Sequence, residues 1–283
     1  MHCGEKKKNN RSGRMKKYRI DEEAKQINLF SERWYHLEEE NADLPSVTTY
    51  LESYPKGDGF NKWLMNTKDP YQRRDEAAQL GSYVHGLVER TLLGDKIKYE
   101  EHVTPIEVWE RYLYWCKFWK ALITDPTKTL KSKKVIKEIV VPKDFTEFIT
   151  FDLEESYAGT VDKLIKIVYE DDSVTYVIVD WKTGEHIYES AKLQIAAYAK
   201  SVGKQFKMPI GLAIIVQLNP EVNQNGYRVN VRTKEEIDND FQDFLAVKQI
   251  WLREHGNQKP KYKSYPTEVD LEFIKNNEII KGA

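Results

Sequence analysis

Two aspartates and a lysine interrupt apolar, strand-like runs near the middle of this 283-residue chain. Asp162 ends the segment Gly159–Asp162, and Asp180 and Lys182 follow in the segment Asp180–Thr183. Neighbouring carboxylates repel each other unless one is protonated or a divalent cation lies between them, and oxygen ligands suit Mg²⁺ or Mn²⁺. A lysine beside such a cation can orient water or stabilise the charge that builds on a phosphate. These residue types therefore indicate phosphodiester hydrolysis.

A β-hairpin would bring the three side chains together. Runs rich in Val, Ile, Leu and Tyr flank the polar cluster Glu170-Asp171-Asp172-Ser173, which is the pattern of two strands and a turn. If the turn centres on this cluster, residue numbers paired across the hairpin sum to about 342, and Asp162 lies opposite Asp180. Because side chains alternate along a strand, Lys182 projects to the same face as Asp180.

An exposed hairpin end with an ordinary Asp–Lys salt bridge is the alternative interpretation of the same residues. The run Val177-Ile178-Val179 argues against it, since it is apolar on both faces, as in a central strand that is covered on both sides. Asp180 is therefore expected to follow buried residues. The carbonyl of Trp181, between the acid and the lysine, could add a metal ligand without using a side chain.

The motifs and their order resemble the PD-(D/E)XK nuclease superfamily. Within it, they resemble the RecB-like exonuclease clade, which includes phage-type nucleases and the mitochondrial genome-maintenance exonuclease. Several members of the clade carry four cysteines for an iron–sulfur cluster, but this chain has two cysteines and cannot build one. The segments that carry the resemblance are Gly159–Asp162 (G-x-x-D), Asp180–Thr183 (D-[YW]-K-T), Gln194–Tyr198 (Q-x-x-x-Y) and Gly81–His85 (G-x-x-x-H).

The resemblance implies a metal site and a catalytic lysine. Asp162 and Asp180 would bind the metal, with Lys182 as the catalytic cation. His85 lies on a helix predicted from Arg73 to Leu93 by the spacing of its apolar residues. A lone helical histidine is more often structural, but the order of the motifs favours His85 as a third ligand.

Other residues are assigned to DNA or to a further acid. Gln194 and Tyr198 are four residues apart on a helix predicted from Tyr188 to Val202, so they share a face. By resemblance, they contact or position DNA. Glu138 lies on the strand before the hairpin, where many members of the family carry an additional acidic residue.

Local charge, rather than net charge, favours nucleic acid. The chain has 44 Lys and Arg against 45 Asp and Glu, a formal net charge of −1. Basic residues gather in a predicted arm at 1–20 and before the first strand, where Lys133 and Lys134 lie. Such clusters can bind phosphates. The arm is explained equally well as a disordered, solubilising tail, whereas Lys133 and Lys134 favour DNA.

The predicted elements point to an α/β (α+β) fold. A short helix opens near Pro45, with Thr49 and Glu52 as a capping box. An aromatic helix from Glu107 to Leu122 is expected to pack in the core. The order of elements matches a restriction-endonuclease-like core, an α-β-β-β-α-β mixed sheet flanked by helices, with helical additions. The expected organisation is a basic disordered arm (1–20), a helical region with His85 (21–130), the nuclease core (131–256) and a tail (257–283).

A reducing cytoplasm, bacterial or that of a phage-infected cell, is the expected location. The two cysteines are far apart, no run of about 20 apolar residues could span a membrane, and the N-terminus lacks an apolar signal core.

Together these features predict a Mg²⁺- or Mn²⁺-dependent DNA exonuclease acting at single-stranded ends or flaps, in recombination, repair or replication processing. DNA is the expected partner, with a recombinase, a single-strand-binding protein or a helicase beside it. Two alternatives keep the fold: a DNA-end-binding scaffold or recombination subunit without catalysis, and a structure-specific endonuclease. A scaffold would gain nothing from burying two like charges, which argues against the first alternative.

Overall fold

The computed structural model of the protein describes residues 25–27, 33–37, 39–219, 223–256, 262–264, 270–276 and 281–282. The predicted basic arm at 1–20 lies outside these residues, as does much of the predicted tail. The strands are β1 (Lys25–Ile27), β2 (Trp34–Leu37), β3 (Ala42–Pro45), β4 (Ile136–Val140), β5 (Thr146–Asp152), β6 (Tyr157–Tyr169), β7 (Val174–Lys182), β8 (Ile210–Leu218), β9 (Tyr227–Thr233), β10 (Tyr262–Ser264) and β11 (Lys281–Gly282). The helices are α1 (Val47–Tyr50), α2 (Asp58–Asn66), α3 (Pro70–Leu93), α4 (Ile106–Thr124), α5 (Pro126–Thr129), α6 (Glu189–Gln205), α7 (Lys234–His255) and α8 (Leu271–Asn276), with 3-10 turns at Leu51–Ser53 and Lys143–Phe145.

A six-stranded mixed sheet forms the centre of the molecule. Its order is β4-β6-β7-β8-β9, and β5 pairs with the remaining length of β6. Strands β6 and β7 form the predicted hairpin, and the pair Lys163–Val179 has the predicted sum of residue numbers. Strand β8 then runs parallel to β7 after the crossover helix α6. The predicted hairpin and its register are confirmed.

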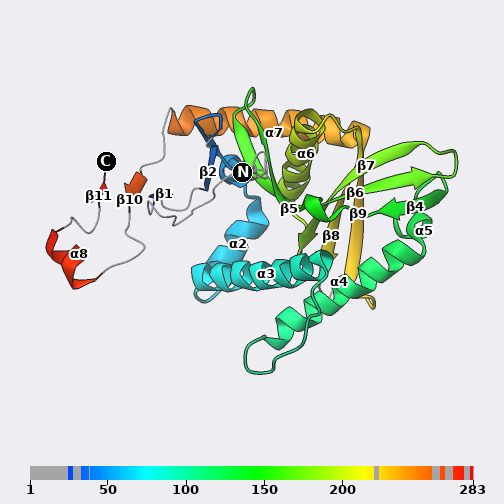
Figure 1. Ribbon diagram of the computed structural model, residues 1–283, viewed down its shortest axis with the longest axis horizontal. Helices are drawn as coiled ribbons and strands as arrows, with labels where there is room; N and C mark the ends of the chain where they lie inside the picture. Colours follow the sequence, from blue (N-terminus) through cyan, green and yellow to red (C-terminus); the bar gives the residue numbers. More distant parts are fainter. Residues whose placement is uncertain are drawn as a thin grey trace, which may run out of the picture.

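Helices cover both faces of this sheet (Figure 1). Leu164 and Ile178 pack on one face with residues of α6 and α7. Their neighbours Ile165 and Val177 pack on the opposite face with residues of α3 and α4. Because successive side chains of a strand alternate between faces, a strand that is covered on both sides is apolar throughout. The predicted α/β architecture, a mixed sheet flanked by helices, is confirmed.

The aromatic helix α4 packs in the core, as predicted. Tyr112 and Trp115 are buried, and Trp119 is partly buried. The rings of Trp115 and Trp119 meet the ring of Trp181 edge to face, with centroids 6.1 and 6.4 Å apart. The indole of Trp181 is therefore held beneath the sheet, which fixes the backbone between Asp180 and Lys182.

The N-terminal part of the chain differs from the prediction in two ways. The predicted helical region contains the hairpin β2–β3, with Trp34 paired to Pro45. The cap of α1 is Ser46, whose side chain accepts a hydrogen bond from the Thr49 amide at 3.0 Å. The predicted capping box at Thr49 and Glu52 is therefore wrong. Ser46 directly precedes the helix and has an extended backbone, which is the geometry that an N-cap requires.

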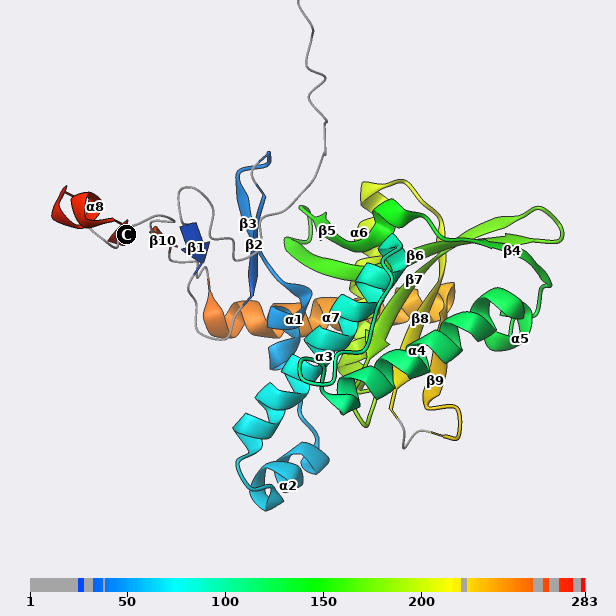
Figure 2. The ribbon, with the colours of Figure 1, turned by 60° about the horizontal axis from the view of Figure 1, so that its bottom comes forward.

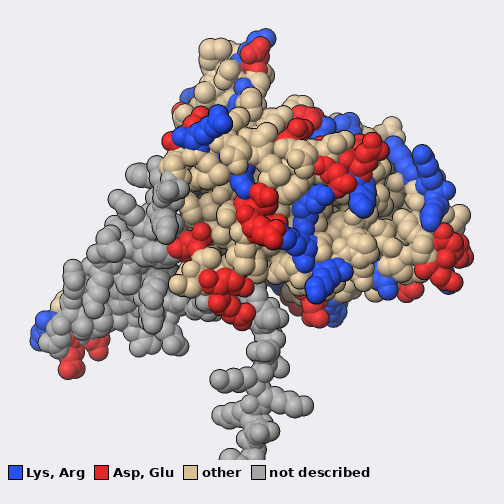
Figure 3. All heavy atoms as spheres, turned by 90° about the horizontal axis from the view of Figure 1, so that it is seen from above, with Lys and Arg blue, Asp and Glu red and all other residues tan. Residues whose placement is uncertain are grey.

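Helix α2 and the first half of α3 extend away from the sheet (Figure 2). In the view of Figure 3, acidic and basic side chains are interspersed over the surface, and neither sign prevails there. Among the residues described, no helix has the length and apolar character needed to cross a membrane.

Candidate metal centre

Three acids from neighbouring strands lie in one row across the sheet. The pairing of β6 with β7 ends at Lys163–Val179, and Asp162 and Asp180 are the next residues of the two strands, so they lie at one level. The pairs Thr146–Lys163 and Phe148–Val161 place Glu147 opposite Asp162 on the other side of β6. Asp162 and Asp180 are 7% and 3% exposed, so two carboxylates are buried side by side, as the hairpin geometry predicted.

His85 reaches this row from α3. Its Nδ1 lies 3.4 Å from Glu147 Oε1 and 3.4 Å from Asp162 Oδ1. Its Nε2 lies 3.1 Å from the carbonyl oxygen of Trp181, so an Nε2–H donates to that carbonyl. The structure thus brings His85 to the acids, as the order of the motifs predicted. The Trp181 carbonyl contacts the ring nitrogen that does not face Glu147 and Asp162. The Trp181 amide donates to Asp162 Oδ2 at 2.7 Å and orients that carboxylate.

Lys182 belongs to a separate chain of hydrogen bonds on the other side of Asp180. Its ammonium donates to Asp180 Oδ1 at 3.0 Å and to Gln194 Oε1 at 2.9 Å. The amide of Gln194 donates to the hydroxyl of Tyr198 at 2.9 Å. Gln194 and Tyr198 therefore position Lys182. Tyr198 is 5% exposed and offers little surface to a ligand, so its geometry favours positioning over direct contact with DNA.

The charges of the cluster shift the pKa values of its members strongly. Burial raises the pKa of Glu147 to about 7, with a further contribution from the Asp162 charge. Burial likewise raises the pKa of Asp180 to about 6, against the opposing effect of the Lys182 ammonium. Burial works against a charged His85, but the Asp162 and Glu147 carboxylates outweigh it and raise the pKa of His85 well above its usual range. A cation added here would take over the neutralisation that protons provide.

The donor set fits a divalent metal ion. Ligand atoms of His85, Glu147 and Asp162 all lie within 4.8 Å of one another. Beside them, Asp180 Oδ2 is buried and has no hydrogen-bond partner among the described residues, although it lies 2.8 Å from the Lys182 ammonium. Two carboxylates and an imidazole that converge in this way are suited to Mg²⁺ or Mn²⁺. The Asp180 carboxylate, which the sequence predicted as a ligand, is paired with Lys182 and does not belong to this group of converging atoms.

Glu147 was missed in the sequence, and Glu138 was expected in its place. Glu138 is exposed and pairs with Val168, six residues along β6 from Asp162, which is about 20 Å away at the usual strand rise. The prediction of Glu138 as an additional site acid is therefore wrong. The β-forming residues of Thr146–Asp152 could have revealed β5. The backbone of Glu147 has φ 45°, a left-handed conformation that costs roughly 1–3 kcal/mol and is concentrated at functional sites.

The lysines before β4 do not reach the metal centre. Lys134 donates to Asp171 at 2.7 Å, at the turn of the β6–β7 hairpin. This turn lies beyond Tyr169, seven residues and about 23 Å along β6 from Asp162. Lys133, beside Lys134, is exposed in the same region. Both lysines therefore lie away from the metal centre, and their assignment to DNA stays a prediction.

Two glycines let the elements of the site approach closely. A Cβ at Gly81 on α3 would lie 3.2 Å from Thr183 Oγ1, beyond the end of β7. A Cβ at Gly159 on β6 would lie 2.2 Å from Cε1 of Tyr198 on α6. The ring of Tyr198 thus rests on the backbone of β6, where a side chain would displace it.

Gly159→Ala is expected to destabilise the protein by about 1–3 kcal/mol or more, because the new methyl group overlaps the Tyr198 ring. Chemical denaturation measures this change in the free energy of unfolding. Gly86→Ala is the matched control, since a Cβ at Gly86 on α3 meets nothing within 4 Å. That variant should be as stable as the parent or more stable by about 1 kcal/mol. Equal stability of both variants would show that Tyr198 does not depend on Gly159.

A comparison with protein families finds one match over most of the chain. The family model described as PD-(D/E)XK nuclease superfamily matches residues 59–265, a range that contains His85, Glu147, Asp162, Asp180 and Lys182. A search of curated proteins finds no match.

Proposed function

The chain belongs to the PD-(D/E)XK nuclease superfamily, and on this premise we propose that it is a Mg²⁺- or Mn²⁺-dependent deoxyribonuclease. We further propose an exonuclease that acts at single-stranded ends or flaps, as in the processing of DNA during recombination, repair or replication. The observation that carries the proposal is the convergence of Glu147, Asp162 and His85 beside an Asp180–Lys182 pair. A binding module would gain nothing from desolvating these charges together.

A divalent cation at this centre would polarise a phosphoryl oxygen and lower the pKa of a water molecule. Glu147, Asp162 and His85 would hold that cation, and Asp180 Oδ2 offers a further oxygen. Lys182 donates from a fixed direction, because Asp180 and Gln194 hold its ammonium. It can therefore orient the attacking water or stabilise the charge on the phosphate without first losing its own conformational freedom.

A cleavage assay with end-labelled oligonucleotides tests the proposal. Linear single-stranded DNA should be degraded with Mg²⁺ or Mn²⁺ and remain intact with a chelator. Circular single strands, and strands blocked at the reactive end, should resist cleavage. Cleavage of the circular strands would contradict the exonuclease assignment and indicate an endonuclease. Binding of DNA ends without cleavage under any metal would contradict nuclease activity and favour a scaffold.

A further inference from the structure

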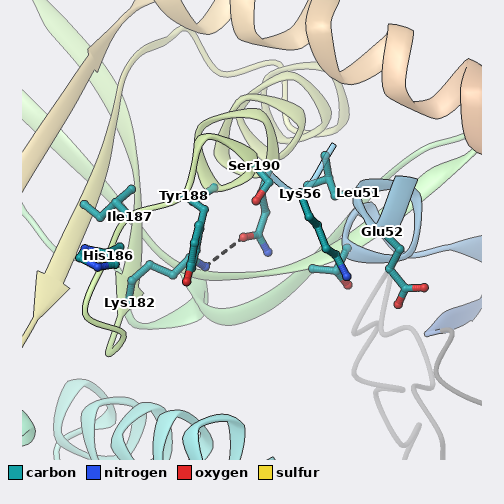
Figure 4. A pocket seen from close by; sticks show the side chains of 11 residues that line it. Leu51, Glu52, Lys56, Lys182, His186, Ile187, Tyr188 and Ser190 are labelled. Atoms are coloured by element: carbon teal, nitrogen blue, oxygen red, sulfur yellow. Dashed lines mark hydrogen bonds between the residues drawn. The ribbon is translucent and has the colours of Figure 1, made fainter. Parts of the chain in front are cut away.

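A pocket of about 280 Å³ lies beside Lys182, and the acids of the metal centre are not among its lining residues. Its size is just below the usual range for small-ligand sites, roughly 300–1,000 Å³. Figure 4 shows Lys182 and Tyr188 at one side of it, Ser190 near its centre, and Lys56 towards the other side. The lining residues come from the segment around α1, from the end of β7 and from the start of α6: Thr48, Leu51, Glu52, Lys56, Lys182, His186, Ile187, Tyr188, Ser190, Ala191 and Gln194.

The lining combines the groups that bind an unpaired nucleotide. Tyr188 is 66% exposed, so most of its ring is available for stacking. Lys56 is exposed and held over the ring of Phe60, 4.9 Å from the centroid, and no carboxylate pairs with it within the described parts of the chain. Glu52 is the acid of the lining, and Figure 4 shows it at the end farthest from Lys182.

We propose that this pocket binds the nucleotide next to the scissile phosphate, with its base stacked on Tyr188 and its backbone phosphate beside Lys56. This inference rests on the proposed function, in which Lys182 faces the reacting phosphate, and Lys182 also lines the pocket. Whatever is bonded to that phosphate must lie beside Lys182. In DNA, the bonded group is a nucleoside.

The pocket also accounts for a preference for single strands. A base within a duplex is paired and stacked on both sides, so its face cannot reach a tyrosine ring. An unpaired base can, and stacking of this kind is tolerant of sequence because every base has a π-face. Tyr188 therefore selects single-stranded substrate near the cleavage point without selecting its sequence.

The first test measures binding in the presence of a chelator, where cleavage does not interfere. A fluorescent adenine analogue is placed at successive positions of a single-stranded oligonucleotide. At one position, the parent protein should quench its fluorescence by stacking, and Tyr188→Ala should abolish the quenching. Tyr188→Phe should retain it. Tyr71→Ala is the matched control, because Tyr71 is 65% exposed but lies outside the pocket. No quenching at any position, or equal quenching by Tyr188→Ala, overturns the proposal.

The second test measures cleavage of the same oligonucleotide. Tyr188→Ala should lower kcat/KM roughly tenfold, the effect expected for one lost base–aromatic stack. An abasic site at the quenched position should cost the parent a similar factor and cost Tyr188→Ala nothing further. If the variant and the abasic site instead lower kcat/KM by factors that multiply, the Tyr188 ring and the base act independently, and the proposed contact is wrong. Lys56→Ala should raise KM and weaken its salt dependence, whereas Lys120→Ala, an exposed lysine on α4, should not. Quenching without cleavage would support the pocket and contradict the nuclease, so the two failures are distinguishable.

Discussion

Lys182→Ala is expected to reduce DNA cleavage roughly 10²- to 10³-fold, the usual effect of removing one preorganised electrostatic donor from an active site. The ammonium is within hydrogen-bonding distance of Asp180 and Gln194, which hold it in one position. Single-turnover cleavage of a single-stranded oligonucleotide at saturating Mg²⁺ measures the effect. Lys182→Arg should recover little activity, because a planar guanidinium cannot occupy the position of a compact ammonium.

Loss of stability must be separated from loss of chemistry in this experiment. Lys248→Met is a control, because Lys248 is a lysine that likewise pairs with a carboxylate, Glu155, at 2.7 Å, and it is buried, at 5% exposed. Both variants lose an ion pair with one buried partner, but α7 carries Lys248 outside the metal centre. Lys248→Met should therefore retain its activity per folded molecule. Cleavage by folded Lys182→Ala at the parent rate would show that Lys182 has no catalytic role.

Glu147→Gln is expected to weaken binding of Mg²⁺ or Mn²⁺ by roughly 100-fold. It removes a charged ligand, and even residues that only support a ligand change metal affinity roughly 10- to 100-fold. Titration calorimetry of the metal-free protein measures the affinity directly. Glu138→Gln is the control, because Glu138 is exposed and lies outside the cluster. A larger effect at Glu138 than at Glu147 would reverse the assignment that the structure supports.

The same variant should change how metal binding depends on pH. In the parent, burial raises the pKa of Glu147 to about 7, so this carboxyl is largely protonated at pH 6 and must lose its proton when a cation binds. Affinity should therefore fall from pH 8 to pH 6, by up to about tenfold per pH unit for each proton displaced. In Glu147→Gln, metal binding should displace one proton fewer, so the affinity should change less steeply with pH. The protons of Asp180 and His85 should still contribute. An unchanged slope would contradict the raised pKa.

Metal-free protein should show the complementary effect on stability. The carboxyl of Glu147 ionises near its ordinary pKa of 4.5 in the unfolded chain but only near 7 in the fold. Its contribution to the free energy of unfolding is therefore lost as the pH rises between these values. His85 acts in the same direction, because its raised pKa stabilises the fold while it is protonated. Added Mg²⁺ should restore stability most at the upper end of this range.

Local geometry made much of the site predictable from the sequence. The turn at Glu170–Ser173 fixes which residues face each other across the hairpin, so Asp162, Asp180 and Lys182 had to converge. Helical spacing likewise placed Gln194 and Tyr198 on one face, where they are hydrogen bonded. In both cases, the distance in space follows from the distance along the chain by a regular repeat.

The tertiary structure alone decided which other elements meet this hairpin. Strand β5 places Glu147 opposite Asp162. The acid on the predicted first strand, Glu138, instead pairs with Val168, far along β6 from Asp162. The packing of α3 on the sheet brings His85 within 3.4 Å of Asp162. Lys134 forms a salt bridge with Asp171 at the hairpin turn and not with the site. Repeats along one element describe which side chains share its face. These repeats do not specify the angle and offset at which a distant element packs, because the packing depends on the side chains of both elements.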